Sequence, residues 1–108
     1  MTVGTLSINL NAIKENWKTL DRLTAPNVET GAVLKANAYG LGIDKVSAVL
    51  KSVGTKEFFV ASISESIQLR KLLNNNAKIY CLNGYTTSDA KDIRSYDIIP
   101  VLNSTEQL

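Results

Sequence analysis

Hydrophobic and polar residues alternate along this chain with two periods, one typical of strands and one typical of helices. Residues 5–10 (TLSINL) alternate apolar and polar side chains, which predicts a strand. Beyond Asn11, which suits an N-cap, apolar side chains recur at helical spacing and predict an amphipathic helix. The members of this apolar stripe are Ile13, Trp17, Leu20 and Leu23.

The same order of strand and helix repeats along the rest of the chain. Apolar runs predict further strands at residues 31–36, 57–61, 78–82 and 97–102. The helix after the first of these runs is expected to end before Gly54, because glycine readily takes the positive φ of a helix end. Its apolar face is predicted on Ile43, Val46, Val49, Leu50 and Val53.

Three later helix starts share a signature. A hydroxyl side chain followed three residues later by an acidic or amide side chain can form a capping box. The signature occurs at residues 62–65 (SISE), 86–89 (TTSD) and 104–107 (STEQ). The first is expected to open a helix that ends at the three asparagines 74–76.

Single helices between apolar strands indicate parallel βαβ units with right-handed crossovers. Five such strands suit either the N-terminal part of a (β/α)8 TIM-type barrel or a doubly wound open sheet. A complete barrel takes about 250 residues, so a barrel would be incomplete in this chain of 108. Pro100 lacks a ladder donor and is expected to weaken or displace the pairing of the last strand.

Composition and charge narrow the range of functions. The chain is 44% hydrophobic and 20% charged, as expected for one folded unit. Its 12 basic and 10 acidic side chains are scattered, which argues against nucleic acid or a membrane surface as partner. Residues 1–10 lack the features of a secretory signal, and no segment matches the roughly 20 apolar residues of a membrane span. A cytoplasmic location is therefore expected.

Cysteine and histidine content restrict the chemistry further. Cys81 is the only cysteine and lies in an apolar run, so it is expected to be a small buried hydrophobic residue. The chain contains no histidine. Nucleophile systems with an imidazole base and the commonest zinc sites are thereby excluded, and no metal site is predicted.

One stretch, residues 31–42 (GAVLKANAYGLG), combines chemically useful residues. Lys35 lies at the predicted carboxyl end of a strand, where parallel α/β folds bind ligands. A desolvated lysine amine can form a Schiff base with an aldehyde. Tyr39, two glycines and the free N–H groups of a helix start can receive a phosphate, so together these features suggest pyridoxal phosphate. A surface lysine beside a simple turn fits the same pattern, whereas the glycine motifs of dinucleotide-binding and P-loop folds are absent.

The segment AVLKANAYGLG resembles the signature of alanine racemases, which are fold-type III pyridoxal-phosphate enzymes. Other segments resemble the same family in order and spacing from about residue 5 onward: INLNAIKENW, FFVASISESIQLR, IYCLNGY and IIPVLNSTEQL. One departure is Leu41, where histidine is commonest in the family, and leucine is expected to pack there without loss of activity. The resemblance implies racemization of L-alanine and D-alanine.

The resemblance also implies roles for individual residues. Lys35 would bind pyridoxal phosphate covalently and act as the base that exchanges the Cα proton on the D-alanine face. Tyr39 would hydrogen-bond the cofactor phosphate. Val33 and Leu82 are candidate walls around the cofactor ring, and core packing is the alternative for both.

Two polar residues nearby are expected to be structural. Arg70 is predicted on a helix exterior or in an ion pair with Glu65, outside the site. Asn37 is expected to fix the turn that follows the lysine.

Other parts of such an enzyme would lie outside these residues. By resemblance, residues 1–108 form the N-terminal portion of the cofactor-binding barrel domain, and the C-terminal β-domain is absent. The opposite-face acid/base would be a tyrosine from that domain of the partner subunit in a homodimer. The present chain is therefore expected to be inactive alone. The family function implies D-alanine supply for peptidoglycan.

Two other functions remain open from the sequence. A non-catalytic pyridoxal-phosphate carrier protein shares the barrel and the lysine, although its pattern lacks the NAYG continuation found at residues 37–40. A cofactor-free βα interaction module is the alternative from another class. Its open sheet edge would need a second copy as partner.

Overall fold

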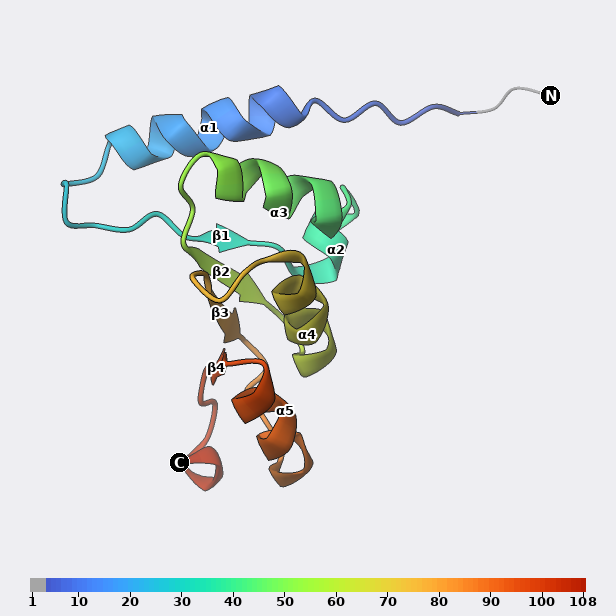
Figure 1. The fold of residues 1–108 in the computed structure, drawn as a ribbon, viewed down its shortest axis with the longest axis vertical. Coiled ribbons are helices and arrows are strands. Elements are labelled where there is room, and N and C mark those ends of the chain that lie inside the picture. Colours follow the sequence, from blue (N-terminus) through green and yellow to red (C-terminus); the bar gives the residue numbers. More distant parts are fainter. Residues whose placement is uncertain (1–3) are drawn as a thin grey trace.

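A computed structural model describes residues 4–108, which contain one four-stranded parallel sheet. Its strands pair in chain order, β1–β2–β3–β4 (Figure 1). The register aligns Val33 with Phe59, Phe59 with Tyr80, and Tyr80 with Ile99. The strands are β1 (Ala32–Val33), β2 (Glu57–Val60), β3 (Lys78–Cys81) and β4 (Ile98–Pro100).

Helices connect successive strands. α3, α4 and α5 each lie between two strands along the chain, whereas α1 precedes β1 and packs on α3. Within residues 4–108, none of the helices has the length and apolar character that a membrane crossing requires. The helices are α1 (Leu10–Arg22), α2 (Lys35–Tyr39), α3 (Ile43–Ser52), α4 (Ile63–Leu72) and α5 (Ala90–Ser95), with short 3-10 helices η1 (Thr87–Asp89) and η2 (Thr105–Gln107).

Strand order and helix placement distinguish the two predicted architectures. A doubly wound sheet reverses its strand order at a switch point and carries helices on both faces. Here the strands follow chain order, and α3, α4 and α5 lie on one side of the sheet (Figure 1). Successive βα units in a barrel wall have this arrangement. The predicted parallel α/β fold of a barrel segment is therefore confirmed, with four strands rather than five.

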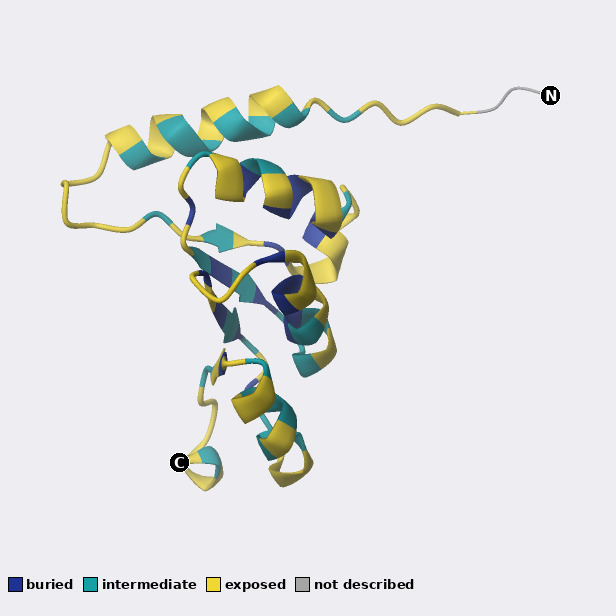
Figure 2. Ribbon diagram, viewed as in Figure 1, coloured by how far each residue is buried: buried dark blue, intermediate teal, exposed yellow. Residues whose placement is uncertain are grey.

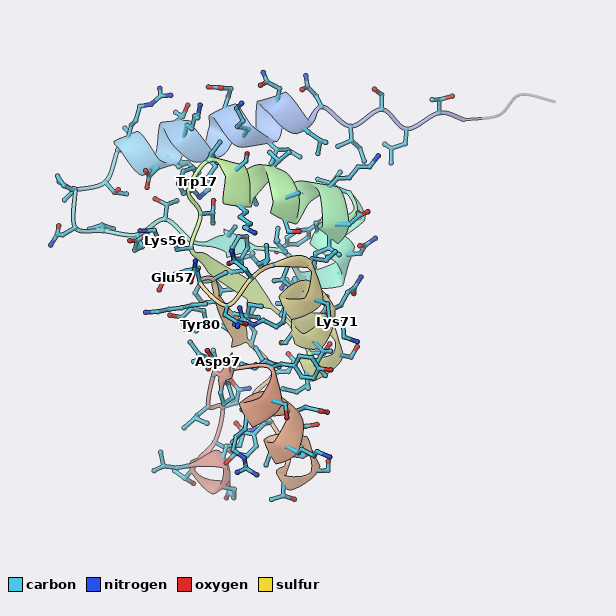
Figure 3. The ribbon with its side chains drawn as sticks, viewed as in Figure 1. Trp17, Lys56, Glu57, Lys71, Tyr80 and Asp97 are labelled. Carbon is cyan, nitrogen blue, oxygen red and sulfur yellow. The ribbon has the colours of Figure 1, made fainter. Side chains whose placement is uncertain are left out.

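Burial alternates along the strands of the sheet (Figure 2). Most strand residues that face the helices are almost fully buried, with Ala32 and Pro100 half-buried, whereas Val33 and Ile99 on the other face are 44% and 36% exposed. On this open face the rings of Phe59 and Tyr80 stack with centroids 4.5 Å apart. The Tyr80 hydroxyl donates to Glu57 Oε1 at 3.0 Å on the side away from the helices (Figure 3). The buried row consists of Phe58, Val60, Ile79, Cys81 and Ile98.

Residues 5–10 do not form the predicted strand. Residues 4–9 belong to no helix or strand, and α1 begins with Asn9, rather than Asn11, as its N-cap. A strand requires a hydrogen-bonded neighbour, and none of the four described strands pairs with this segment. Alternation of apolar and polar residues was therefore insufficient evidence for a strand here.

Helix α1 buries only half of its predicted apolar stripe. Ile13 and Trp17 pack against the core. The Trp17 indole N–H donates to the carbonyl of Thr30 at 3.2 Å and so ties α1 to the segment before β1 (Figure 3). Leu20 and Leu23 are 58% and 78% exposed, because the core beneath this helix ends before them.

Two of the three predicted capping boxes form. At the start of α4, the Ser62 hydroxyl accepts from the Glu65 backbone N–H at 3.2 Å, and the Glu65 carboxylate accepts from the Ser62 N–H at 3.1 Å. Residues 86–89 form the second box and open η1. Gly54 follows α3 with a φ of 103°, as predicted.

The third box, at residues 104–107, does not form. Ser104 makes no side-chain cap, and Gln107 Oε1 accepts instead from the backbone N–H of Asn103 at 2.7 Å. The Gln107 side chain also donates to the carbonyl of Tyr85 at 3.0 Å. Competition from these backbone groups explains why the STEQ signature failed.

Arg70 is buried, so both expectations for it were wrong. Its side chain is only 7% exposed, and it points to backbone carbonyls rather than to Glu65. Burial lowers the pKa of Arg70, and the negative charge of Asp97 opposes this shift. The rigid fork of five guanidinium donors suits several acceptors at once. These acceptors, at 2.7 to 3.0 Å, are the carbonyls of Asn74, Ala77, Tyr96 and Asp97.

Pro100 lies on β4, opposite Cys81. Proline is tolerated on an edge strand, and β4 is an edge of the described sheet. Pairing continues past it, because the Val101 N–H donates to the Cys81 carbonyl at 2.9 Å. Cys81 itself is fully buried, as predicted.

Candidate functional site

Lys35 lies directly beyond the carboxyl end of β1. The strand ends at Val33, earlier than predicted, although the Leu34 N–H still donates to the Phe59 carbonyl of β2 at 2.8 Å. Lys35 is exposed, and no ion pair in the described part of the chain involves it. The side-chain amine is therefore available at the end of the sheet where parallel α/β folds bind ligands.

The residues after Lys35 form a left-handed turn. Ala36, Asn37, Ala38 and Tyr39 all have φ between 54° and 56°. Left-handed helical geometry costs an L-residue about 1–2 kcal/mol, and it persists only where the surroundings hold it. α2 is thus a strained turn rather than an ordinary helix.

Asn37 fixes this turn, as predicted. Its carbonyl accepts from the Gly42 N–H at 3.0 Å, and its side-chain Oδ1 accepts from the Ile43 N–H at 2.9 Å. The same contacts bear on the expectation that the start of α3 offers free N–H groups to a phosphate. The first of these N–H groups, that of Ile43, already has a partner, and Asp44 adds a negative charge to this helix turn. The start of α3 is therefore a poorer anion site than the sequence suggested.

Tyr39 and Leu41 follow on the same loop. Tyr39 is 62% exposed, so its hydroxyl is accessible as a donor. Leu41 lines a hollow of about 250 Å³ together with Leu6, Ile8 and Leu10. Leu41 is 39% exposed, so the packing expected at the position where the family most often has histidine is only partial within the described residues.

Val33 and Leu82 belong to the open face and the carboxyl end of the sheet. Val33 is aligned with Tyr80 through the register of β2, and Leu82 directly follows Cys81, the last residue of β3. Leu82 is half-buried, and its N–H donates to the Val60 carbonyl at 2.8 Å.

Glu65 is the residue that sequence reasoning missed. Its Oε2 accepts from the backbone N–H of Ala36 at 2.7 Å, while its Oε1 serves the capping box of α4. The capping signature correctly predicted the second contact. No sequence pattern indicated the first, because it joins residues 29 positions apart.

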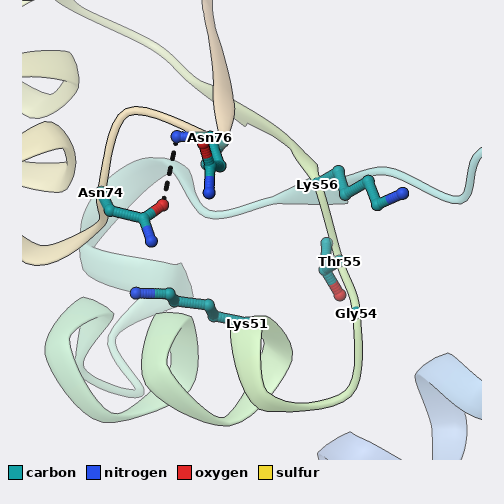
Figure 4. Close-up of a pocket in the computed structure, with 7 residues that line it drawn as sticks. Lys51, Gly54, Thr55, Lys56, Asn74 and Asn76 are labelled. Carbon is teal, nitrogen blue, oxygen red and sulfur yellow. Dashed lines mark hydrogen bonds between the residues drawn. The ribbon is translucent and has the colours of Figure 1, made fainter.

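A cleft at the opposite end of the sheet contains none of the predicted site residues (Figure 4). Its volume is about 210 Å³. The Thr55 hydroxyl at its wall is buried and has no hydrogen-bond partner among the described residues. Because this cleft precedes β2 and β3, it lies at the amino end of the strands, away from the usual ligand position. Its walls are Lys51, Gly54, Thr55, Lys56, Asn74, Asn76 and Ala77.

The residues at the carboxyl end fit a cofactor with an aldehyde and an anionic group. Lys35 offers an unpaired primary amine, and Tyr39 offers an accessible phenol four residues later. Val33 and Leu82 add apolar surface that the described chain leaves partly exposed. This set can bind an aldehyde covalently and orient a phosphate by hydrogen bonding.

Comparison with known proteins identifies relatives of this chain. The family model for the N-terminal domain of alanine racemase matches residues 8–108. An alanine racemase of Cereibacter sphaeroides is 44% identical over all 108 residues, which span 31% of that protein. A catabolic alanine racemase of Agrobacterium fabrum is 45% identical over 105 residues, which cover 97% of this chain and 27% of that protein.

Solved structures agree with these relatives. The crystal structure of alanine racemase from Bartonella henselae with covalently bound pyridoxal phosphate has a TM-score of 0.87 and 42% identity, covering 93% of this chain and 29% of that one. Biosynthetic alanine racemase from Pseudomonas aeruginosa has a TM-score of 0.82 and 32% identity, covering 91% and 27%. The chain thus spans about a third or less of the proteins that it matches. Sequence, fold and the family match over residues 8–108 together show that this chain belongs to the family of alanine racemase N-terminal domains.

Proposed function

We propose that this chain is the N-terminal part of a pyridoxal-phosphate-dependent alanine racemase, which interconverts L-alanine and D-alanine. The observation that carries the proposal is the unpaired lysine directly beyond β1, followed by a left-handed turn that ends at Tyr39. Support comes from the relative of Bartonella henselae, whose pyridoxal phosphate is covalently bound. Pyridoxal phosphate supplies an electron sink for the charge that develops at the substrate Cα.

The chain's own residues would divide the work of binding and proton transfer. Lys35 Nζ holds the cofactor covalently and, once released by the substrate amine, exchanges the Cα proton on the D-alanine face. The Tyr39 hydroxyl donates to the cofactor phosphate. Val33 and Leu82 shield the ring from water on the side of the sheet.

Racemization also needs an acid/base on the opposite face of the substrate. We assign this group to residues outside the present 108, in a C-terminal β-domain contributed by the second subunit of a homodimer. The isolated 108 residues are therefore proposed to be inactive. The complete enzyme would act in the cytoplasm and supply D-alanine for peptidoglycan.

The test is covalent attachment of the cofactor to Lys35. The protein from the complete reading frame is mixed with pyridoxal phosphate, its visible absorbance is recorded, and the product is reduced with borohydride. We expect a visible band and a reduced label on the peptide that contains Lys35, both abolished by Lys35→Ala. Lys56→Ala is the control, because Lys56 is exposed at the opposite end of the sheet.

Substrate exchange completes the test. With the label established, the protein is expected to interconvert the two alanine enantiomers and to exchange the Cα proton of alanine for deuterium from the solvent. A folded complete protein without the band would refute the proposal. That outcome would favour the alternative function, a cofactor-free βα interaction module.

A further inference from the structure

Glu65 makes more contacts than a capping box requires. A box needs one carboxylate oxygen to accept from the N-cap backbone. Glu65 Oε1 accepts from the backbone N–H groups of Ala61 and Ser62, both at 3.1 Å, and this completes the box. The second oxygen, Oε2, leaves α4 and accepts from the Ala36 N–H at 2.7 Å, the shortest of the three contacts.

This contact anchors the peptide group that follows Lys35. The peptide group before Lys35 is also held, because its Leu34 carbonyl accepts from the Ala38 N–H at 2.9 Å, and the Leu34 N–H of the preceding peptide group donates to the Phe59 carbonyl at 2.8 Å. Peptide groups are planar, so holding one on each side of Lys35 restricts the two backbone dihedrals of that residue. The direction from which the Lys35 side chain leaves the backbone is thereby restricted as well.

The same contact supports the strained turn. Ala36 is the first residue with positive φ, and the chain makes this change directly after the strand. A hydrogen bond to a carboxylate is stronger than one between neutral groups. The other supports of the turn are local: the Ala38 N–H donates to the Leu34 carbonyl at 2.9 Å, and Asn37 joins the turn to the start of α3, which follows it directly along the chain. Among the described side chains, Glu65 is the one that hydrogen-bonds the turn to an element distant in the sequence, α4.

We infer that Glu65 is a positioning residue for Lys35, which holds the Lys35–Ala36 peptide group so that the lysine amine meets the cofactor aldehyde in a fixed orientation. The inference rests on the proposed function of Lys35. Glu65 itself touches neither cofactor nor substrate in this assignment. Its effect on rate comes through orientation, where small displacements have large consequences.

Two substitutions separate this role from capping. Glu65→Ala removes both the box and the Ala36 contact, whereas Ser62→Ala removes the hydroxyl that accepts from the Glu65 N–H and donates to Glu65 Oε1 at 3.4 Å but keeps the Oε2 atom that accepts from Ala36. Both are expected to weaken the start of α4, each by about 1 kcal/mol for the lost cap. Only Glu65→Ala should free the Ala36 amide. Glu65→Gln keeps the side-chain length and serves as the second variant.

The experiment uses the complete protein and three readouts. Hydrogen exchange of the segment around Ala36 reports the contact, the rate at which the visible band develops reports attachment to Lys35, and thermal melting reports stability. Glu65→Ala is expected to speed exchange at Ala36 and to slow attachment on the order of 10-fold, while Ser62→Ala melts earlier but attaches at the normal rate. In Glu65→Gln the attachment rate should follow the exchange rate at Ala36. In turnover of alanine, the kcat of Glu65→Ala should fall with little change in KM.

The outcomes distinguish this inference from the proposed function. Normal attachment in a Glu65 variant whose Ala36 amide exchanges faster would overturn the positioning role alone. Equal slowing in Ser62→Ala, or Glu65 variants that are unfolded where Ser62→Ala is folded, would assign the contact to the fold and also overturn it. A wild-type protein that forms no band would overturn the proposed function and this inference together.

Discussion

The two ends of α4 each carry one charged side chain that is satisfied by the backbone of other elements. At the first turn, Glu65 accepts N–H groups from Ala36, Ala61 and Ser62. At the last turn, Arg70 donates to four carbonyls, including those of Tyr96 and Asp97. In a βα unit the helix start lies near the carboxyl end of the sheet, so the two side chains act at opposite ends.

The difference follows from which backbone groups each end leaves unpaired. A helix start exposes N–H groups and a helix end exposes carbonyls, so a carboxylate suits the first and a guanidinium the second. Glu65 extends this complementarity to the turn that carries the candidate site. Arg70 extends it to the loops that join α4 to β3 and α5 to β4. One end of the helix therefore serves the site, and the other serves the scaffold.

The largest effect on the free energy of unfolding is expected from Arg70→Ala, at the end of α4 that serves the scaffold. Arg70→Ala leaves four buried or half-buried carbonyls without their donor, and we expect a loss of about 3 kcal/mol in the free energy of unfolding. Denaturant titration measures it. Arg94→Ala, an exposed arginine on α5, is the control and should change stability by less than about 0.5 kcal/mol. Similar losses in the two variants would contradict the anchoring role.

Alkaline pH should lower the free energy of unfolding through a buried thiol at the site end. Cys81 Sγ donates to the Ala61 carbonyl at 3.4 Å, beneath the loop that Glu65 caps, and burial raises the pKa of this thiol. The unfolded thiol ionises near pH 8.5, so above this pH the folded state holds more protons and stability falls with rising pH. The expected slope is at most about 1.4 kcal/mol per pH unit, up to the raised pKa of the folded thiol.

Comparing wild type with Cys81→Ala isolates this slope. The variant loses some packing at every pH, but its free energy of unfolding should be flatter between about pH 8 and 9.5, below the titration of tyrosine and lysine. Denaturant midpoints across that window supply the measurement. Parallel curves for the two proteins would show that the buried thiol does not titrate differently on folding.

The smallest expected effect is the coupling between the two ends. Glu65 and Arg70 share no hydrogen-bond partner, so the stability losses of Glu65→Gln and Arg70→Ala should add within about 0.5 kcal/mol in the double variant. A double-mutant cycle by denaturant titration provides the value. A larger coupling would mean that α4 transmits strain from one end to the other, and that the division between site and scaffold is incomplete.

Local patterns predicted the elements that need only local information. Helix α4 begins at its capping box because Ser62 and Glu65 satisfy each other within one turn, and Gly54 follows α3 because it tolerates positive φ. The position of Lys35 at a strand end was also predictable, although β1 ended three residues earlier than the apolar run suggested. Residues 5–10 failed as a strand because their pattern says nothing about a pairing partner.

The sequence by itself determined the alternation of strands and helices, the lysine motif of residues 31–42 and the family to which they point. Only the tertiary structure decided that Ala36 to Tyr39 turn left-handed, that Glu65 reaches Ala36, and that Arg70 is buried. The physical reason is common to all three. Each depends on which distant backbone group finds a partner, and buried N–H and carbonyl groups must be paired wherever the fold brings them together.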